Sequence, residues 1–569
     1  MWMFKSSPTL LTRQPNPAAP KVTYTARGAC LPSASNTNGK RVRSGEKQSL
    51  ATQASVAKGA TSLYVANVVV LLANTLYFLV LTNILRSTLD VGIVTALNLT
   101  ISFLVTICIL AQPVTGQSPI PAPLAVLKFL PELLAKGART RAAKVFRISF
   151  GISGILASAV AGILVVSPNL VVPLIGGQTV LPDFVRLAAV DVLVFSLSQV
   201  CFGALIAVGD LRNATIYIIS WSVARYALAS ILLIPYSIFG VLLGWIMGDT
   251  VVLVIAFRKS IQQVRGGSGS RNFSLVNLWR YSLYTLFSAL IGFAVMQADK
   301  IFTLASKGLP ELAIYNVAIV AASFAGFAPY ALLTVLLPAL SALHSTGETR
   351  KMHEMIRNYT RYVSIVVLPI AVGFASVAEI ALRIFGPDYV SGLVPTMIVS
   401  VATGLTAIGA VYAGALLAAG ELRWYTAANL LGLGALFTVS ALLTSSLGLA
   451  GPALGRATLM AVAAFVYAVG MWRNGFLEVD VRAYLSAAGG SALMAIVVFG
   501  ALGAVHSFLL KLALLPALIV VGAIIYLGSL RLLRLLTATD LEFAFGILPS
   551  RFHPIVLKIG RLLVIKAQR

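Results

Sequence analysis

Long runs of hydrophobic residues, separated by short polar stretches, fill the chain from about residue 60 to about residue 535. Residues 65–81, 148–166 and 514–530 are three such runs, and they contain almost no charged side chain. A helix of about 17 to 19 residues can cross a hydrocarbon layer of about 30 Å, since it rises about 1.5 Å per residue. The runs are too long and too continuously apolar for barrel strands. The pattern therefore predicts an all-α polytopic membrane protein.

Fourteen runs are long enough to span a membrane. We expect them at residues 60–83, 91–112, 145–167, 184–208, 213–236, 239–257, 277–298, 312–338, 360–384, 393–419, 424–446, 449–472, 484–508 and 511–534. The composition agrees, because 58% of the 569 residues are hydrophobic and only 11% are charged. Soluble domains have about 25% charged residues. We expect membrane lipids to surround the chain.

The net charge of +25 is distributed as in an oriented membrane protein. Lys and Arg gather in the loops after even-numbered spans, at positions such as Lys136, Arg139, Arg212, Lys259, Arg350, Arg423 and Arg482. The loops after odd-numbered spans and their edges hold fewer, chiefly Arg86, Lys300, Lys307, Arg383 and Lys511. Cytoplasmic loops carry this excess of positive charge. We therefore expect a plasma-membrane protein with both termini in the cytoplasm, and we expect no nucleic-acid partner.

Two halves of the chain resemble one another. Residues 203–212 (GALIAVGDLR) recur as residues 414–423 (GALLAAGELR), an offset of 211 (414 minus 203). Further matches in the same order are Gly240 with Gly451, Gly244 with Gly455, and residues 137–147 with 347–357 at an offset of 210. Several ordered matches at a nearly constant offset indicate an internal duplication.

The duplication predicts two parallel six-helix repeats plus two additional transmembrane helices. An even number of spans makes both halves enter the membrane in the same direction, and substrate sites form where such halves meet. The predicted parts are a disordered basic cytoplasmic tail (1–55), an N-terminal six-helix lobe (56–260), a C-terminal six-helix lobe (261–475), the two additional helices (476–536) and a basic interfacial tail (537–569). We expect a monomer.

Several short motifs resemble those of the polysaccharide (Wzx-like) flippases in the multidrug/oligosaccharidyl-lipid/polysaccharide exporter superfamily. They are LDVGI at 89–93, an amphipathic stretch at 124–137, ADK at 298–300, IYNVA at 314–318, LPALS at 337–341, IFGPDY at 384–389 and GELR at 420–423. The resemblance covers roughly residues 57–535, and fourteen spans suit this branch, whereas the related drug exporters usually have twelve.

The resemblance implies a transporter that flips or exports a lipid-linked oligosaccharide, on a polyprenyl or dolichyl diphosphate, for surface polysaccharide or glycan synthesis. Transport would proceed by alternating access between the two lobes. The implied substrate is the lipid-linked sugar, and a proton or sodium ion is the candidate coupling ion. The three cysteines give no even framework, so no disulfide or metal site follows from them. We also expect no cofactor.

Charged residues inside the predicted spans are the first candidates for the mechanism, because each is costly in lipid. Arg225 lies near the middle of the fifth span and could bind a phosphate through two parallel hydrogen bonds. A buried ion pair with Asp249, in the sixth span, explains it equally well. Asp191 and Asp249 are candidate coupling carboxylates, although capping or pairing would also account for them.

Other candidates lie near the ends of spans. Arg280 and Arg361 lie near cytoplasmic ends, where side chains commonly reach the lipid phosphates. Arg186 and Arg456 lie near outer ends, against the orientation bias, and all four are weaker substrate-binding candidates than Arg225. Asp299 and Lys300 close the seventh span and could gate it or pair locally.

Two other classes of function stay open. A drug or cation antiporter would share this fold but usually lacks the last two spans. An integral-membrane glycosyltransferase or polymerase would need charged groups on a substantial outer loop, whereas the longest outer loop, residues 167–183, has one acid and no basic residue. The chain also shows no Asp-x-Asp pair, phosphate-binding loop or His/Glu metal cluster. We therefore do not expect an enzyme.

The charge distribution makes a testable prediction of topology. Cysteines introduced at Gly177 and Ser446 should react with an impermeant thiol reagent added outside intact cells, because both positions lie in predicted outer loops. A cysteine at Gly347, in a predicted cytoplasmic loop, should stay unlabelled until the cells are opened. Labelling of the Gly347 position in intact cells would contradict the orientation.

Overall fold

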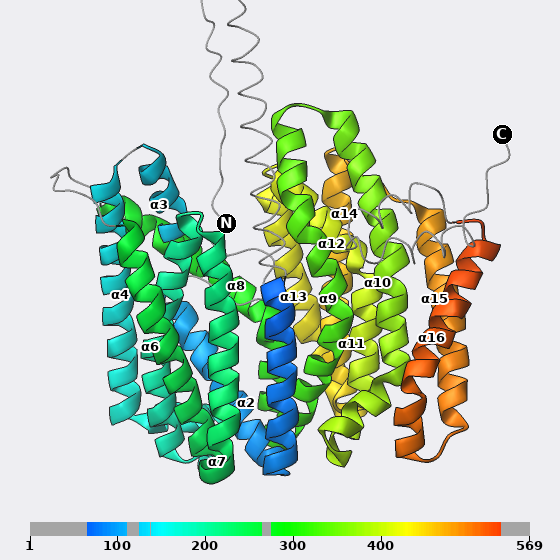
Figure 1. Cartoon of the computed structure of the whole chain (residues 1–569), viewed down its shortest axis with the longest axis horizontal. Helices are drawn as coiled ribbons and strands as arrows, with labels where there is room; N and C mark the ends of the chain where they lie inside the picture. The colour runs from blue at the N-terminus through cyan, green and yellow to red at the C-terminus, as the bar shows by residue number, and fades with distance from the viewer. Residues whose placement is uncertain (1–64, 111–124, 137, 265–274, 536–569) are drawn as a thin grey trace, which may run out of the picture. The chain divides into compact units, whose positions relative to one another are not determined.

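A computed structural model describes residues 65–110, 125–136, 138–264 and 275–535 of the chain. Within these ranges every regular element is a helix. The basic tails predicted at 1–55 and 537–569 lie outside the described residues. The all-α polytopic fold predicted from the hydrophobic pattern is confirmed (Figure 1).

The first half of the chain contains five long helices and one short amphipathic helix. They are the first span at Val65–Leu85, α2 (Thr88–Cys108), α3 (Ala125–Ala135), α4 (Arg139–Val166), α6 (Pro182–Ala207) and α7 (Leu211–Val264). Three short turns connect α4 to α6, namely η1 (Pro168–Leu170), α5 (Val172–Ile175) and η2 (Gly177–Thr179).

The helices of the second half and of the additional pair come next along the chain. Their helices are α8 (Leu275–Lys307), α9 (Leu309–Ser345), α10 (Thr349–Phe385), η3 (Pro387–Gly392), α11 (Leu393–Leu405), α12 (Ala407–Ala418), α13 (Leu422–Leu447), α14 (Ala450–Arg473), α15 (Val481–Gly503) and α16 (Phe508–Leu532). Together α11 and α12 form the span predicted at 393–419, interrupted at Thr406.

The helix α7 accounts for two of the predicted spans. It bends sharply at Ser237, whose φ of 52° and ψ of −134° are not helical, two residues after Pro235. A proline inside a helix favours such a break. Thirteen helices in the described ranges are long and apolar enough to cross a membrane, and the segment Arg212–Gln262 is counted once among them. Because its two arms are separate spans, the total is fourteen (13 plus 1), as predicted.

Close helix contacts repeat at the same offset in the two halves. In the two arms of α7, a Cβ added to Gly244 would collide with the backbone of Ala229. In the second half, a Cβ added to Gly455 on α14 would collide with Ser440 on α13. Both partners are displaced by 211 residues (455 minus 244, and 440 minus 229), the offset found in the sequence. The duplicated motifs thus encode the same tightly packed helix hairpin.

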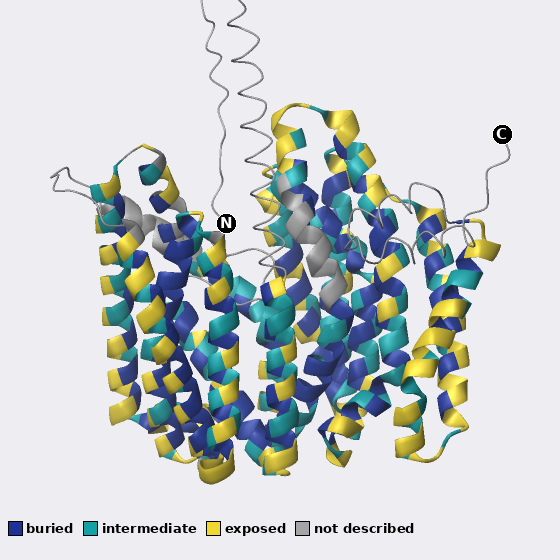
Figure 2. Ribbon diagram, in the orientation of Figure 1, coloured by how far each residue is buried: buried dark blue, intermediate teal, exposed yellow. Residues whose placement is uncertain are grey.

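Hydrophobic side chains both fill the interior and cover the outside. One buried cluster joins the first-half helices to the beginning of α9 and the end of α10, and a second holds the inner parts of α9, α10, α12 and α14 together. Figure 2 shows exposed residues along the outward faces of α4, α15 and α16. Many of these are large and apolar, such as Ile155 and Ile496, and a surface of this kind is suited to lipid rather than water. The exact borders of the two lobes remain a prediction.

The glycine contacts of the helix hairpins make a testable prediction. Gly244→Val should lower the free energy of unfolding by about 1–3 kcal/mol, because the new side chain would force apart the two arms of α7. The matched control is Gly434→Ala on α13, where nothing lies within 4 Å of an added Cβ. The control should be neutral or stabilising in denaturant unfolding of the purified protein in detergent. Equal stability of the two variants would contradict the close packing.

Candidate functional site

A buried network of three charges lies in the first half. Arg225, on the first arm of α7, donates through Nη2 to Oδ2 of Asp191 on α6 at 3.0 Å. Through Nη1 it also donates to Oδ2 of Asp249 on the second arm of α7. Arg225 is 3% exposed, and both carboxylates are fully buried. The pairing of Arg225 with Asp249, one of the two alternatives drawn from the sequence, is present, and Asp191 is an additional partner.

Local packing makes room for this network. Gly248 lies directly against Arg225, since a Cβ added there would be 2.7 Å from the Arg225 backbone. The positions that correspond to Arg225 and Gly248 in the second half are Leu436 and Leu459, at the offset of 211, and both belong to an apolar cluster. The position that holds Arg225 in one half therefore holds a hydrocarbon side chain in the other.

Aromatic rings surround the guanidinium of Arg225. Its Cζ lies 4.7 Å from the ring centre of Trp245 and 5.1 Å from that of Phe195. Trp221 stacks on Phe195 with centroids 5.6 Å apart and planes 5° apart. Such faces stabilise a cation, more strongly where water is excluded. Aromatic rings on α6 and on both arms of α7 thus stabilise the Arg225 guanidinium together with the two carboxylates.

The charge balance of the network has a chemical consequence. Two ionised carboxylates and one guanidinium would leave one negative charge in an apolar interior, which is costly. Within the described part of the chain, Oδ1 of Asp191 and Oδ1 of Asp249 have no hydrogen-bond partner. A single proton would neutralise the group. The arrangement is therefore suited to binding and releasing one proton, in line with the predicted coupling role of these two carboxylates, which remains a prediction.

A second buried network lies in the second half. Asp299 on α8 is fully buried, and its Oδ2 accepts hydrogen bonds from Nη1 of Arg456 on α14 at 2.7 Å and from the hydroxyl of Tyr315 on α9 at 2.9 Å. Arg456 keeps 17% of its side chain exposed. Lys300 follows Asp299 on α8 and is half-buried. The structure thus brings together Asp299 and Arg456, which the sequence suggested separately, and adds Tyr315.

The remaining substrate-binding candidates lie apart from these networks. Arg186 is 48% exposed and pairs with Asp183 at 2.5 Å, one turn earlier on α6. Arg280 lies on α8, but its side chain is outside the described residues. The exposed pair of Arg186 with Asp183 contributes little to stability. Nε of Arg186 also donates to the carbonyl of Val165, at the end of α4, at 3.2 Å.

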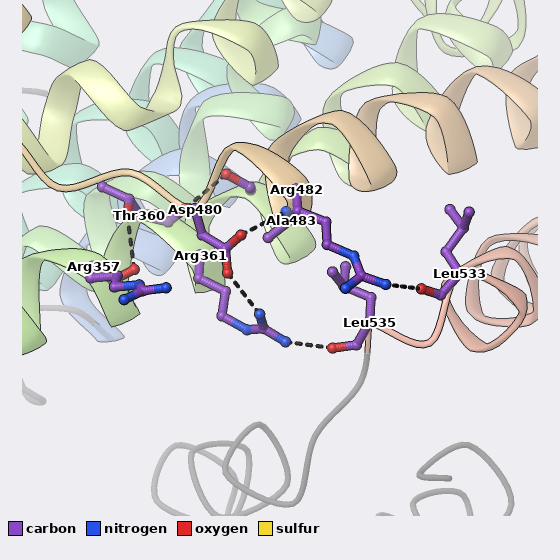
Figure 3. Close-up of polar contacts among 9 residues, drawn as sticks. Arg357, Thr360, Arg361, Asp480, Arg482, Ala483, Leu533 and Leu535 are labelled. Atoms are coloured by element: carbon purple, nitrogen blue, oxygen red, sulfur yellow. Dashed lines mark hydrogen bonds and ion pairs between the residues drawn. The ribbon is translucent and has the colours of Figure 1, made fainter. Parts of the chain in front are cut away.

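Arg361 fastens the additional helices to the second half (Figure 3). From α10 it donates to Oδ2 of Asp480 at 2.8 Å and to the carbonyl of Leu535, and Arg482 donates to the carbonyl of Leu533 at 3.1 Å. Asp480 also caps α15 by accepting from the N–H of Ala483. Burial tends to raise the pKa of Asp480, but the Ala483 N–H and Arg361 outweigh it, and the pKa lies below its usual range.

A second contact near the C-terminal end of α10 holds the same pair of helices. Glu379 on α10 accepts from Lys511 of α16 at 2.9 Å and from Arg383 at 3.0 Å. One turn after Arg361, the Ile365 carbonyl accepts from the hydroxyl of Tyr526 on α16 at 2.7 Å. The pair α15–α16 is therefore attached to α10 near its middle and near its C-terminal end, and Arg361 has an anchoring role in this arrangement.

The two halves of the chain meet at the beginning of α2 and α9. A Cβ added to Gly92 would collide with the backbone carbonyl of Leu309, the first residue of α9. Nearby, the amide of Asn83 donates to the carbonyl of Ile384 at 3.1 Å. In the predicted orientation these contacts lie at the outer side of the membrane. No single residue in the sequence signals them, although Gly92 lies within the LDVGI motif.

Among the residues that the structure describes, no group of three or more His, Cys, Asp or Glu side chains could hold a metal ion. Cys108 and Cys201 are buried and unpaired with one another.

Comparison with known proteins supports the resemblance. Residues 136–391 match the family model described as polysaccharide biosynthesis protein, and over this segment the resemblance inferred from the sequence is confirmed. No curated protein matches the chain by sequence.

Solved structures of transporters share the fold. The lipid II flippase MurJ in an inward closed conformation superposes with a TM-score of 0.65 at 12% identity, covering 84% of this chain and 98% of its own. The MATE transporter VcmN from Vibrio cholerae, in its bent form, gives 0.53 at 16% identity and covers 77% and 99%. A transporter of the MOP superfamily from Pyrococcus furiosus gives 0.54 at 14% identity and covers 74% and 96%. At these identities the likeness establishes the fold.

The charge network of the first half makes a testable prediction. Arg225→Leu should lower the free energy of unfolding by about 3–5 kcal/mol, because it leaves two buried carboxylates without their cation. Adding Asp249→Leu should restore only part of this loss, since Asp191 would still be unpaired. The triple variant, with Asp191→Leu as well, should recover most of it in thermal unfolding of the detergent-solubilised protein. Wild-type stability of the single variant would contradict the network.

Proposed function

We propose that this chain, whose central segment matches the polysaccharide biosynthesis family, flips a lipid-linked oligosaccharide across the plasma membrane. The observation that carries the proposal is the combination of that family match with a flippase-like fold in one chain. The substrate would be a polyprenyl- or dolichyl-diphosphate sugar, and the two halves would expose it alternately to the two sides of the membrane.

The exposure of the charged groups indicates which of them could meet such a substrate. A diphosphate needs a cation that it can reach. Arg456 keeps 17% of its side chain exposed, whereas Arg225 is 3% exposed and is occupied by two carboxylates. We therefore favour Arg456, with the half-buried Lys300, for contact with the headgroup. Arg225 would instead keep Asp191 and Asp249 in place as a proton-coupled pair.

A drug or cation antiporter is the second candidate function. Transporters of the MATE family share the fold, and the buried carboxylates of the first half could bind a proton in either kind of protein. The additional pair α15–α16 favours the flippase, because the drug exporters usually lack it. An enzyme is not favoured, since the family match and the shared fold both point to transport.

A cross-link across the outer contact tests the proposal. In Asn83→Cys/Ile384→Cys, a short bifunctional thiol reagent should join the halves, because the Asn83 amide lies 3.1 Å from the Ile384 carbonyl. Cross-linking should abolish flipping of a fluorescent polyprenyl-diphosphate oligosaccharide in reconstituted vesicles, and a cleavable reagent should restore it.

The matched control places the cross-link between the second half and the additional pair α15–α16. Glu379→Cys/Lys511→Cys joins α10 to α16 at a place where Nζ of Lys511 lies 2.9 Å from Oε2 of Glu379. This cross-link should leave flipping unchanged. If the untreated protein transports a cationic drug but no lipid-linked sugar, the proposed flippase function is wrong and the antiporter function is supported. If cross-linked Asn83→Cys/Ile384→Cys still flips the substrate at the untreated rate, the proposed movement of the halves is wrong.

A further inference from the structure

The beginning of helix α9 lies between the two halves and has two different faces. Leu309, Leu312 and Ala313 are buried in the same cluster as the first-half helices. Tyr315 is on another face, fully buried in a cluster with Val399 of α11 and Ala453 of α14. Tyr315 is only three residues from Leu312, so it lies at the edge of the first face, and its membership of the second cluster separates the two. The outer part of α9 therefore forms the boundary between the halves.

The contact of α9 with α2 leaves no spare room. The Leu309 carbonyl occupies the place that a side chain at Gly92 would need. Leu312 and Ala313 are each 0% exposed. A small displacement of α9 would therefore weaken the contact, because a gap of about 0.5–1 Å already forfeits a quarter to a half of the dispersion attraction.

The other face of α9 is attached to its own half by apolar packing, by a long hydrogen bond from Thr396 on α11 to the Ala318 carbonyl at 3.5 Å, and by a side-chain bond of Tyr315. The hydroxyl of Tyr315 donates to Oδ2 of Asp299, and Nη1 of Arg456 donates to the same oxygen. The second oxygen of Asp299, Oδ1, has no partner among the described residues. A hydrogen bond to an ionised carboxylate is roughly twice as strong as one between neutral groups. One oxygen atom thus joins α8, α9 and α14, and the strength of its bond to Tyr315 depends on the charge of Asp299.

We propose that Tyr315 is a positioning residue that holds α9 in the closed outer contact, and that the ionised Asp299–Arg456 pair keeps it there. The proposal rests on the alternating movement of the halves proposed above, but not on the identity of the substrate. Loss of the negative charge on Asp299 weakens the bond from Tyr315, frees the outer part of α9 and opens its contact with Gly92. Lys300, next to Asp299 on α8 and half-buried, is a further charged group beside this network.

Accessibility of a buried reporter tests the proposal without any substrate. Ala313→Cys places a thiol in the α2–α9 contact with little change in volume, and an impermeant maleimide should label it slowly from outside. Labelling should become at least fivefold faster when Tyr315→Phe or Asp299→Asn is added. Gly92→Val should have a similar effect as a positive control, since its side chain would push α9 away.

The matched control is Tyr412→Phe, which removes a tyrosine hydroxyl bonded to the Glu478 carbonyl at 3.2 Å, outside the α2–α9 contact. Its labelling rate should equal that of Ala313→Cys alone. An unchanged rate with Tyr315→Phe in a well-folded protein overturns the proposal, and so does equal acceleration by Tyr412→Phe. If Asp299→Asn fails to fold, the Tyr315→Phe result decides alone. Altered labelling without any flipping would uphold the role of Tyr315 and count against the lipid-linked substrate.

Discussion

Inside a lipid layer a charged side chain has no water to solvate it, so each one must find its partner within the protein. Arg225 meets this requirement with two carboxylates from different helices and the faces of two aromatic rings. The need to bring these groups together dictates how closely α6 and the two arms of α7 approach. The close approach of the two arms of α7 requires a glycine at position 248, because any side chain there would collide with the backbone of Arg225.

Comparison of the two duplicated halves shows which of these features, the helix packing or the buried charges, both halves share. The tight hairpin contact at Gly244 recurs at Gly455, so close packing of these helices belongs to the repeated fold itself. The charges do not recur, since Arg225 corresponds to Leu436. The second half has its own ion pair, but that pair joins α14 to α8 instead of lying within the hairpin. The charged residues thus differ between halves that still pack alike.

The sequence predicted the spans, their number and the duplication, because hydrophobic length and a constant offset are local or linear properties of a chain. The Arg225–Asp249 pair was foreseeable as an alternative, since both residues lie midway along consecutive spans. Asp191 as a partner and Tyr315 as a donor to Asp299 were not foreseen, because they come from other helices whose facing sides a single sequence does not reveal. The contact of Gly92 with Leu309 depends in the same way on how two distant helices cross.

The placement of the ion pairs bears on how the halves could move. Each ion pair described above joins residues of the same half or attaches α15–α16 to the second half. Movement of one half against the other would therefore leave these costly buried pairs intact. Of the contacts described above, such movement would break the apolar contact of α2 with α9 and the bond from Asn83 to Ile384, and a hydrogen bond of this kind contributes about 1 kcal/mol. The described ion pairs thus lie within each half, whereas the described contacts between the halves are apolar apart from the Asn83 bond.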